Sequence, residues 1–335
     1  MNQFHSEFKI IAEIGCNHEG NLEKAIELTH LAADAGADIV KFQSFTPERF
    51  TAADNKDRLE QITKFALTKE NYLILKNIID QRNLLFMSTP VTEDWVEFLY
   101  PLCYAIKIAS GDITFEPVIR KSASTGQHVI LSTGASTLDE IDKAISWIQA
   151  EIGNEKIHDR LTLMHCVSSY PTPLEEANVL SIPFLRERYG VNVGYSNHVI
   201  GMSACLSAVA LGATLLEVHF TDNKIGRSFR DHALSFDYND LKNFVRLSKE
   251  MRKSLGQYDK QVQPCESKNI PLIRKGIVAA KDIKVGDILT KENLMFSRPA
   301  SEFCSGDLYQ LLGKRANRDI MRGYLIFKDA IVCAE

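Results

Sequence analysis

The sequence lacks a strong charge of either sign. Its 39 lysines and arginines nearly balance its 43 aspartates and glutamates, and the formal net charge is −4. Proteins that bind nucleic acid usually carry a broad basic surface. We therefore expect no nucleic-acid partner, and any anionic ligand must be held by a few local cations.

The sequence also lacks paired cysteines and long hydrophobic runs. Its seven cysteines are an odd number without CxxC spacing, and this indicates reduced thiols in a cytoplasmic protein rather than a disulfide framework. No window approaches 18 uninterrupted apolar residues, and residues 1–15 show no basic region followed by a long apolar run. We expect neither a membrane span nor a signal peptide.

Between residues 8 and 255 the chain alternates short apolar runs with segments of helical periodicity. Apolar runs on both faces of a strand, separated by helices, indicate a parallel sheet covered by helices. Eight βα units in about 250 residues favour an α/β fold of the closed (β/α)8 TIM barrel type over the alternative, an open doubly wound sheet. The expected strands are residues 8–14, 38–43, 84–89, 105–110, 128–133, 161–166, 191–196 and 214–220. The clearest expected helices are residues 22–36, 69–83, 137–153 and 202–212.

A polar stretch with two prolines, residues 256–275, interrupts this alternation and is typical of a linker. It separates a barrel domain, residues 1–255, from residues 276–335. The second segment contains short apolar runs punctuated by "VGD" and "RGY" turns, which predict a small, mostly β module.

Lysines stand near the ends of two expected strands, at Lys41 and Lys107. Strand ends converge on one mouth of a barrel, and a buried ammonium is costly unless an anion meets it. With the serine and threonine hydroxyls of neighbouring strand ends, the two lysines predict a cradle for a phosphate or a carboxylate. The alternative is that each lysine pairs with Glu13, Glu217 or Asp112 of the protein itself.

Histidines close the seventh and eighth expected strands, at His198 and His219. A lone histidine is more often a hydrogen-bonded structural residue than a ligand. Two imidazoles on adjacent strand ends can share one metal ion and leave its other positions to water and substrate. His18, His165 and His232 are further candidates that spacing does not rank.

Seven segments in order, among them "FMSTP", "YAIKIASGDIT", "LMHCVSSYPTP", "VGYSNH" and "ALGATLLEVHFT", resemble the sialic acid synthase family. The resemblance covers nearly the whole chain, and the C-terminal stretch resembles the antifreeze-like (SAF) domain of that family. Members condense phosphoenolpyruvate with an N-acylated amino sugar to make nine-carbon acids. The resemblance thus implies a transferase of the N-acetylneuraminate synthase type with a role in polysaccharide biosynthesis.

The resemblance also implies roles for single residues. His198 and His219 would hold a divalent metal, usually manganese, with magnesium or cobalt as alternatives. Glu13, Lys107 and Asp231 would act in catalysis, with Glu13 and Asp231 as competing candidates for handling a water molecule. Arg298 would reach the barrel mouth of the partner in a domain-swapped homodimer. The remaining substrate-binding positions are Lys41, Gln43, Thr89, Ser110, Ser132, Ser168, Tyr170 and Ser196.

Three departures from the family pattern lie in segments expected on the sugar side. Asp112 replaces the usual glutamate, "GRSFRDH" (residues 226–232) replaces a proline-rich stretch and sets Arg230 before Asp231, and "RPASEFC" (residues 298–304) follows an altered pattern after Arg298. The acceptor therefore stays open between N-acetylmannosamine, which gives N-acetylneuraminate, and a 6-deoxy diacetamido sugar, which gives a legionaminate or a pseudaminate.

Two other functions compete with this interpretation. Another phosphoenolpyruvate aldol synthase on a barrel would use a phosphorylated sugar, and it would need a second basic cluster for which Arg227 and Arg230 are candidates. A barrel protein related to polysaccharides but without catalysis is the second alternative. The lysines and histidines at the strand ends argue against it.

Overall fold

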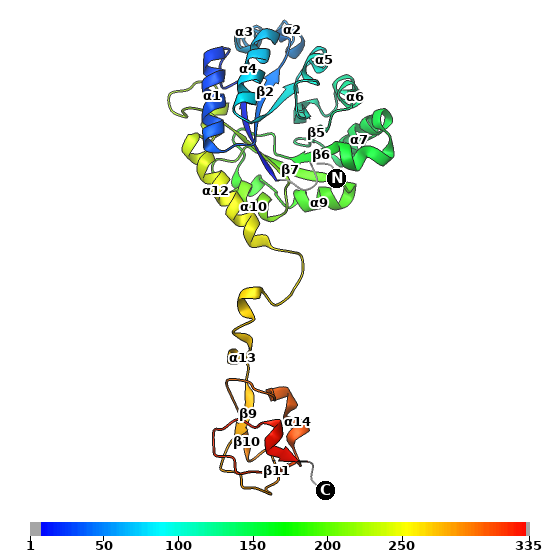
Figure 1. Cartoon of the computed structure of the whole chain (residues 1–335). Coiled ribbons are helices and arrows are strands. Elements are labelled where there is room, and N and C mark those ends of the chain that lie inside the picture. The colour runs from blue at the N-terminus through cyan, green and yellow to red at the C-terminus, as the bar shows by residue number, and fades with distance from the viewer. Residues whose placement is uncertain (1–7, 333–335) are drawn as a thin grey trace. The chain divides into compact units, whose positions relative to one another are not determined.

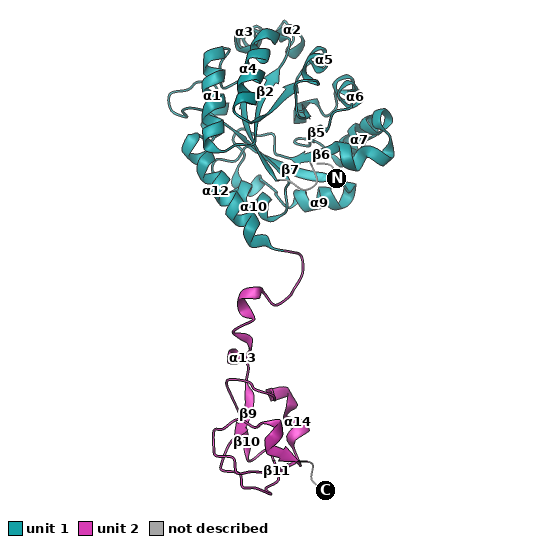
Figure 2. Cartoon of the chain, in the orientation of Figure 1, with its two compact units in different colours: residues 1–256 teal, residues 257–335 magenta. Residues whose placement is uncertain are grey.

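The computed structural model describes residues 8–332 and divides into two compact units, residues 1–256 and residues 257–335 (Figure 2). Part of the segment searched for a signal peptide, residues 1–7, and also Cys333 lie outside the described residues. Each unit is described separately below.

Eight parallel strands close into a barrel in chain order, from β1 next to β2 round to β8 next to β1 (Figure 1). This confirms the TIM barrel and excludes the open sheet. The strands are β1 (Lys9–Gly15), β2 (Ile39–Ser44), β3 (Leu85–Pro90), β4 (Ile106–Ile108), β5 (Val129–Ser132), β6 (Leu161–His165), β7 (Asn192–Asn197) and β8 (Leu215–His219). β4 is shorter than the expected 105–110, because Ser110 already belongs to a 3-10 turn, Ser110–Asp112.

Helices surround the barrel, and their ends follow local sequence rules. In α1 the Asn21 side chain accepts from the backbone N–H of Lys24, and the helix stops at Gly36, whose φ of 91° favours glycine. Within residues 8–332, no helix combines the length and apolar content needed to cross a bilayer. The helices of this unit are α1 (Leu22–Ala35), α2 (Pro47–Phe50), α3 (Lys56–Phe65), α4 (Lys69–Gln81), α5 (Val96–Leu99), α6 (Glu116–Ser124), α7 (Leu138–Ile152), α8 (Ile157–Arg160), α9 (Ser181–Tyr189), α10 (Ser203–Ala210), α11 (Asp231–Leu234) and α12 (Tyr238–Leu255).

The barrel interior consists of an apolar layer beneath a mostly polar one. Side chains two positions apart on a strand point to the same face. The apolar layer is built by Ile11, Ile39, Met87, Ala105, Ile130, Met164 and Leu215. Two positions further along the same strands or their ends stand Glu13, Lys41, Thr89, Lys107, Ser132, Cys166 and Glu217. Because strand side chains alternate with a period of two, these groups all point into the barrel and together form the floor of its mouth.

Gly194 makes room in this interior. A Cβ atom at this position would lie 2.6 Å from the carbonyl oxygen of Leu215 on the neighbouring strand β8. That approach is far inside van der Waals contact, so β7 lies close to β8 only because residue 194 has no side chain. Ser196, two residues on, is thereby brought next to Glu217, with which it forms a hydrogen bond.

The second unit is small and built from antiparallel strand pairs, as the expected mostly-β module requires. β9 (Gly276–Ala279) pairs with β10 (Leu294–Ser297), and β11 (Arg315–Ala316) pairs with β12 (Ile331–Val332). Its short helices are α13 (Ile270–Ile273) and α14 (Leu308–Leu311). Its own core contains Ile277, Ala279, Ile283, Leu289, Leu294, Phe303, Leu311, Ala316, Ile320, Ile326 and Ala330.

Candidate active site

The C-terminal ends of the barrel strands surround a cavity of about 140 Å³. This is the end of a TIM barrel at which enzymes bind their ligands. The cavity brings together most of the residues that were predicted from the sequence to bind substrate or metal or to act in catalysis. These are Glu13, Lys41, Gln43, Thr89, Lys107, Ser110, Ser132, Tyr170, Ser196, His198, His219 and Asp231.

Some nominated residues lie elsewhere. Ser168 is not among the described lining residues, but its hydroxyl lies 2.8 Å from that of Ser110, which does line the cavity, so its role in substrate binding stays a prediction. Arg298 belongs to the second unit, where it is exposed, so its role at a partner's cavity stays a prediction. His165 donates from Nε2 to the carbonyl of Ala177 and is structural.

Two buried lysines and two buried glutamates share the cavity floor. The Lys41 ammonium lies 2.8 Å from Glu13 Oε2 and 3.6 Å from Glu217 Oε2, and Lys107 lies 3.6 Å from Glu217 Oε1. All four side chains are at most 5% exposed. The lysines therefore do pair within the protein, with Glu13 and Glu217, as the alternative prediction stated. Among residues 8–332, no ion pair joins either lysine to Asp112.

The two lysines differ in how well they are neutralised. Burial would lower the pKa of Lys41, but the charges of Glu13 and Glu217 outweigh burial and raise it. Burial lowers the pKa of Lys107, and the charge of Glu217 offsets burial only in part. Burial would raise the pKa of Glu217, yet Lys107 and Lys41 hold it at about 2. Lys107 is therefore the ammonium that gains most from an additional anion.

Hydroxyl groups complete the floor. Lys41 donates to Thr89 Oγ1 at 3.2 Å, and Ser196 donates to Glu217 Oε1 at 2.8 Å. The Ser132 hydroxyl is buried and has no hydrogen-bond partner among the described residues. A buried unpaired hydroxyl costs free energy, so Ser132 has a donor and an acceptor to offer a ligand.

The imidazoles of His198 and His219 lie side by side at the cavity wall, with ring centroids 5.5 Å apart. Nδ1 of His198 is 2.6 Å from the Val167 carbonyl, and since a carbonyl only accepts, Nδ1 carries the proton and Nε2 keeps a free lone pair. Nδ1 of His219 is buried without a hydrogen-bond partner in the described part of the chain.

This pair fits a divalent cation in its chemistry. Burial, followed by the neighbouring His219, lowers the pKa of His198 to about 4, so the ring is neutral as metal ligation requires. No group of three or more His, Cys, Asp or Glu side chains in residues 8–332 is arranged to hold a metal. A metal here would thus have two protein ligands and take its other ligands from water and substrate.

Sequence reasoning missed one side of the cavity. Phe50, Arg58, Ile62 and Phe65 reach it from α2 and α3, which follow β2, and Phe229 reaches it from the segment after β8. The Phe65 and Phe229 rings meet edge to face at 5.1 Å, and the Arg58 guanidinium lies over the Phe50 ring. The only sequence signal is the amphipathic period of α3, which is equally typical of an outer helix.

Fold and cavity together define a class: a TIM-barrel protein with two lysines and two glutamates buried on the cavity floor and two imidazoles in its wall, followed by a small β unit. Residues 28–260 match the NeuB family, and residues 274–332 match the SAF domain. The chain therefore belongs to the NeuB family and carries a SAF domain.

Similar proteins specify the family further. The chain is 36% identical to N,N'-diacetyllegionaminic acid synthase of Campylobacter jejuni over 331 residues. This match covers 95% of this chain and 98% of that protein. It is 32% identical to pseudaminic acid synthase of Helicobacter pylori, over 92% of this chain and 94% of that protein. The crystal structure of N-acetylneuraminic acid synthetase from Leptospira borgpetersenii, in complex with citrate, has a TM-score of 0.74 and 32% identity, with 79% of this chain and 90% of that chain covered. The chain is thus an enzyme of the sialic acid synthase family.

Removal of the Glu217 charge tests the balance of the floor. In Glu217→Gln the buried ammonium of Lys107 loses its carboxylate, and we expect the free energy of unfolding to fall by about 3–5 kcal/mol. Inorganic phosphate should restore more stability to this variant than to the wild type, as measured by thermal unfolding with and without phosphate. The matched control Ser196→Ala removes only a hydroxyl donor to the same carboxylate and should cost about 1–3 kcal/mol. Equal stability of Glu217→Gln and wild type would contradict this charge balance.

Asp112 provides a pH-dependent test. Burial raises the pKa of its carboxyl to about 6, against the opposing charge of Lys107. A raised carboxyl pKa means that the folded state holds the proton longer, so this group lowers stability as pH rises through the window from about 4 to about 6. Asp112→Asn should therefore raise the melting temperature more at about pH 7.5 than at about pH 4.5. A gain of the same size at both values would show that the carboxyl titrates normally.

Proposed function

We propose that this enzyme condenses phosphoenolpyruvate with an open-chain N-acetylated amino sugar, cleaves the C–O bond of phosphoenolpyruvate and releases inorganic phosphate. One observation carries the proposal. Two buried lysines and the paired imidazoles of His198 and His219 face one cavity on a TIM barrel of this family. The first pair suits an anionic substrate, and the second suits a carbonyl-polarising cation.

The floor supplies the anion-binding half. Phosphoenolpyruvate has a carboxylate and a phosphate, and Lys41 and Lys107 with the hydroxyls of Thr89, Ser110 and Ser132 can bind both ends. Binding at both ends holds the enol plane in one orientation. Glu217 compensates the buried positive charge of Lys107 only in part, and a bound anion would complete that compensation.

The carboxylates supply the proton-handling half. The electron pair of the C2=C3 enol bond forms the bond from C3 to the aldehyde carbon, and the aldehyde C=O pair moves to its oxygen, which takes up a proton. Water adds at C2 and loses a proton, and the C2–O bond to phosphate then breaks with its electron pair leaving on phosphate, while the hydroxyl at C2 loses its proton and becomes the ketone. Glu13 is our candidate for orienting and deprotonating this water, because Lys41 at 2.8 Å and Gln43 at 3.2 Å hold its two oxygens in place. Asp231 is the competing candidate, since it also faces the cavity.

We propose His198 and His219 as the ligands of a divalent metal, with Mn²⁺ preferred over Mg²⁺ or Co²⁺. Such an ion, when bound, supplies Lewis-acid polarisation of the acceptor carbonyl. Donation from His198 Nδ1 to the Val167 carbonyl keeps the ring fixed with Nε2 available.

For the acceptor we propose a 6-deoxy diacetamido sugar, which would give a legionaminate or a pseudaminate. Phe50, Ile62, Phe65 and Phe229 give this side of the cavity apolar surface that suits methyl groups. The Arg58 guanidinium reaches the cavity on the same side and lies over the Phe50 ring. Identity argues only against the phosphorylated acceptor, at 36% to a diacetyllegionaminic acid synthase against 28% to the human N-acetylneuraminate-9-phosphate synthase.

A panel of acceptors tests the function. We expect phosphate release from phosphoenolpyruvate with Mn²⁺ to be fastest with 6-deoxy diacetamido sugars, slower with N-acetylmannosamine and slowest with its 6-phosphate. Mass spectrometry of each product identifies the acid formed. Preference for the phosphorylated sugar would establish the phosphorylated-acceptor alternative, and no release with any acceptor would support the non-catalytic one.

Glu13→Gln tests the acid–base role. We expect turnover to fall by about 10²–10⁴-fold while the amino sugar still binds, because the amide keeps the shape but loses the basic oxygen. Binding is measured by calorimetry and turnover by phosphate release. If turnover stays within about tenfold, the role belongs elsewhere. Asp231→Asn is the matched rival, and the larger loss of kcat identifies the group that handles the water.

His198→Ala and His219→Ala should each abolish turnover and metal retention. In the wild type, a chelator should silence phosphate release until Mn²⁺ is restored. Metal content after gel filtration gives a readout besides activity, and His165→Ala, which removes an imidazole outside the described cavity lining, is the control. Full activity in chelator would overturn the metal assignment.

A further inference from the structure

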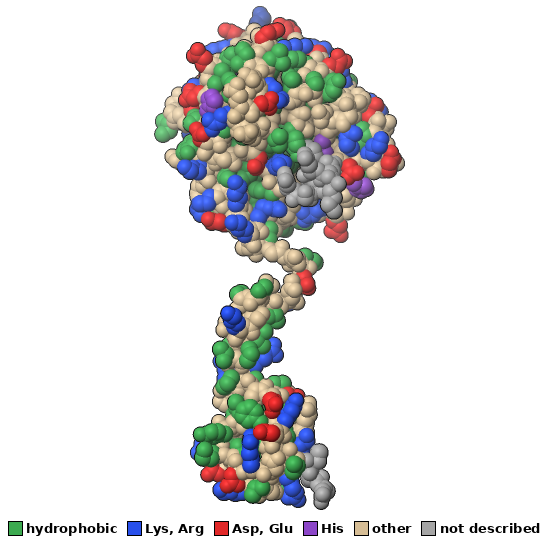
Figure 3. All heavy atoms as spheres, viewed as in Figure 1, with side chains coloured by type: hydrophobic (Ala, Val, Ile, Leu, Met, Phe, Trp, Pro, Cys, Tyr) green, Lys and Arg blue, Asp and Glu red, His purple; other side chains and the backbone are tan. Residues whose placement is uncertain are grey.

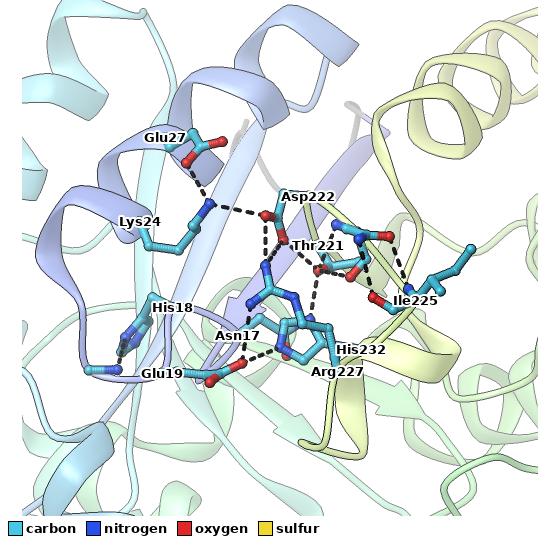
Figure 4. A network of polar contacts seen from close by, with 12 residues as sticks. Asn17, His18, Glu19, Lys24, Glu27, Thr221, Asp222, Ile225, Arg227 and His232 are labelled. Carbon is cyan, nitrogen blue, oxygen red and sulfur yellow. Dashed lines mark hydrogen bonds and ion pairs between the residues drawn. The ribbon is translucent and has the colours of Figure 1, made fainter.

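The segment from Thr221 to Asp231, which joins β8 to α11, covers one side of the cavity with Phe229, Arg230 and Asp231. It contains no regular helix or strand of its own apart from its final residue. Its position over the cavity therefore depends on contacts with neighbouring elements. Figure 4 shows that these contacts converge on the loop between β1 and α1.

Arg227 is the centre of the contacts. Its Nη2 donates to both oxygens of Asp222, at 2.8 and 2.7 Å, and its Nη1 lies 3.5 Å from Glu19 Oε1 in the β1–α1 loop. Lys24 of α1 binds Asp222 from the other side, at 3.0 Å. The Arg227 side chain is 26% exposed and that of Asp222 is 16% exposed, so these ion pairs are partly shielded from water.

His232, directly after the C-terminal end of the segment, also contacts the β1–α1 loop. Its side chain is fully buried, with Nε2 3.1 Å from Glu19 Oε1 and Nδ1 2.7 Å from the Thr221 hydroxyl (Figure 4). Asn17 of the β1–α1 loop adds donations to the Phe220 carbonyl and the Ser235 hydroxyl. Glu19 is thus shared by Arg227 and His232, one on each side of Arg230 and Asp231.

The segment presents its functional groups between these anchors. The Arg230 guanidinium lies 4.6 Å from the ring centre of Tyr170, and Tyr170 in turn lies 4.1 Å from the His198 ring. Arg230 Nε also donates to Asp231 Oδ1 at 3.1 Å. A shift of the segment would therefore move both Asp231 and the cation that lies over Tyr170, the ring next to His198.

We propose that Arg227 is a positioning residue for the acceptor side of the cavity. By pairing with Asp222 and Glu19 it holds residues 221–231 so that Arg230 and Asp231 face the acceptor. This assignment replaces the alternative in which Arg227 binds an acceptor phosphate, since two carboxylates already occupy its guanidinium and it is not among the described lining residues. The inference rests on the proposed condensation with phosphoenolpyruvate.

The full-length variant Arg227→Gln tests the inference. It removes the charge and the bidentate pair but leaves the strand-end lysines untouched. We expect kcat/KM for the amino sugar to fall about 10- to 100-fold, because loss of alignment is costly for reacting groups. KM for phosphoenolpyruvate should change by less than about twofold, because its binding groups lie on the strand ends. Arg227→Lys, which keeps one ion pair, should recover part of the loss.

The matched control is Arg188→Gln. Arg188 pairs with Asp142 at 2.9 Å on the outside of the barrel, so this variant loses an ion pair of the same kind without touching the segment. If both variants keep wild-type kinetics, or if Arg227→Gln raises KM for phosphoenolpyruvate as much as KM for the sugar, the positioning role is overturned while the proposed function stands. If the wild type itself releases no phosphate with any acceptor, both proposals fail.

A double-variant cycle on kcat/KM provides a second readout, which measurements of thermal stability would not give. Glu19→Gln and Arg227→Gln should both lower kcat/KM for the sugar, and the loss in the double variant should be smaller than the product of the two single losses, because the two residues contact each other and hold the same segment. Losses that multiply independently would contradict a shared anchoring role for Glu19 and Arg227.

Discussion

The pairing of Lys41 and Lys107 with Glu13 and Glu217 is the interaction on which the site depends. Four charges within a barrel are tolerable only if they neutralise one another, and each must therefore stand on a strand that places it beside its partners. The balance is uneven, because Lys107 has a single carboxylate at 3.6 Å among the described residues. Lys107 is thus the less completely paired of the two ammonium groups on the floor, and under the proposed function it is the one that an anionic substrate would pair with.

The two sides of the cavity differ in origin. The floor is made by strand ends, whose positions are fixed by barrel hydrogen bonding and by the apolar layer one step below. The acceptor side is made by α2 and α3 and by residues 221–231, which hold their places through aromatic contacts and the ion pairs of Arg227. Relatives named for different sugars have similar identities to this chain, 36% and 32%, so overall identity does not choose the acceptor. Under the proposed function, that choice is made by side-chain contacts on the second side.

Much of the fold and floor could be predicted because both follow from local periodicity. A short, mostly apolar run marks a buried parallel strand, and a polar residue at its end marks the barrel mouth, as with His219 at the end of β8. The prediction that Ser110 belongs to the fourth strand was wrong, because β4 ends at Ile108 and Ser110 begins a 3-10 turn. The contact between the Ser168 and Ser110 hydroxyls could not be predicted, because strand spacing has no information on rotamers, and substrate binding by Ser168 stays a prediction.

The sequence by itself determined the barrel, the strand-end lysines and imidazoles and the small β unit, because alternation with a period of two decides which side chains enter the interior. Only the tertiary structure decided that Arg58 and Phe65 reach the cavity from α3, and that Arg227 is held by Asp222 and Glu19 instead of facing a ligand. The loop after β1 and the segment after β8 are about 200 residues apart in the chain, and they meet because closing a barrel makes its first and last strands neighbours.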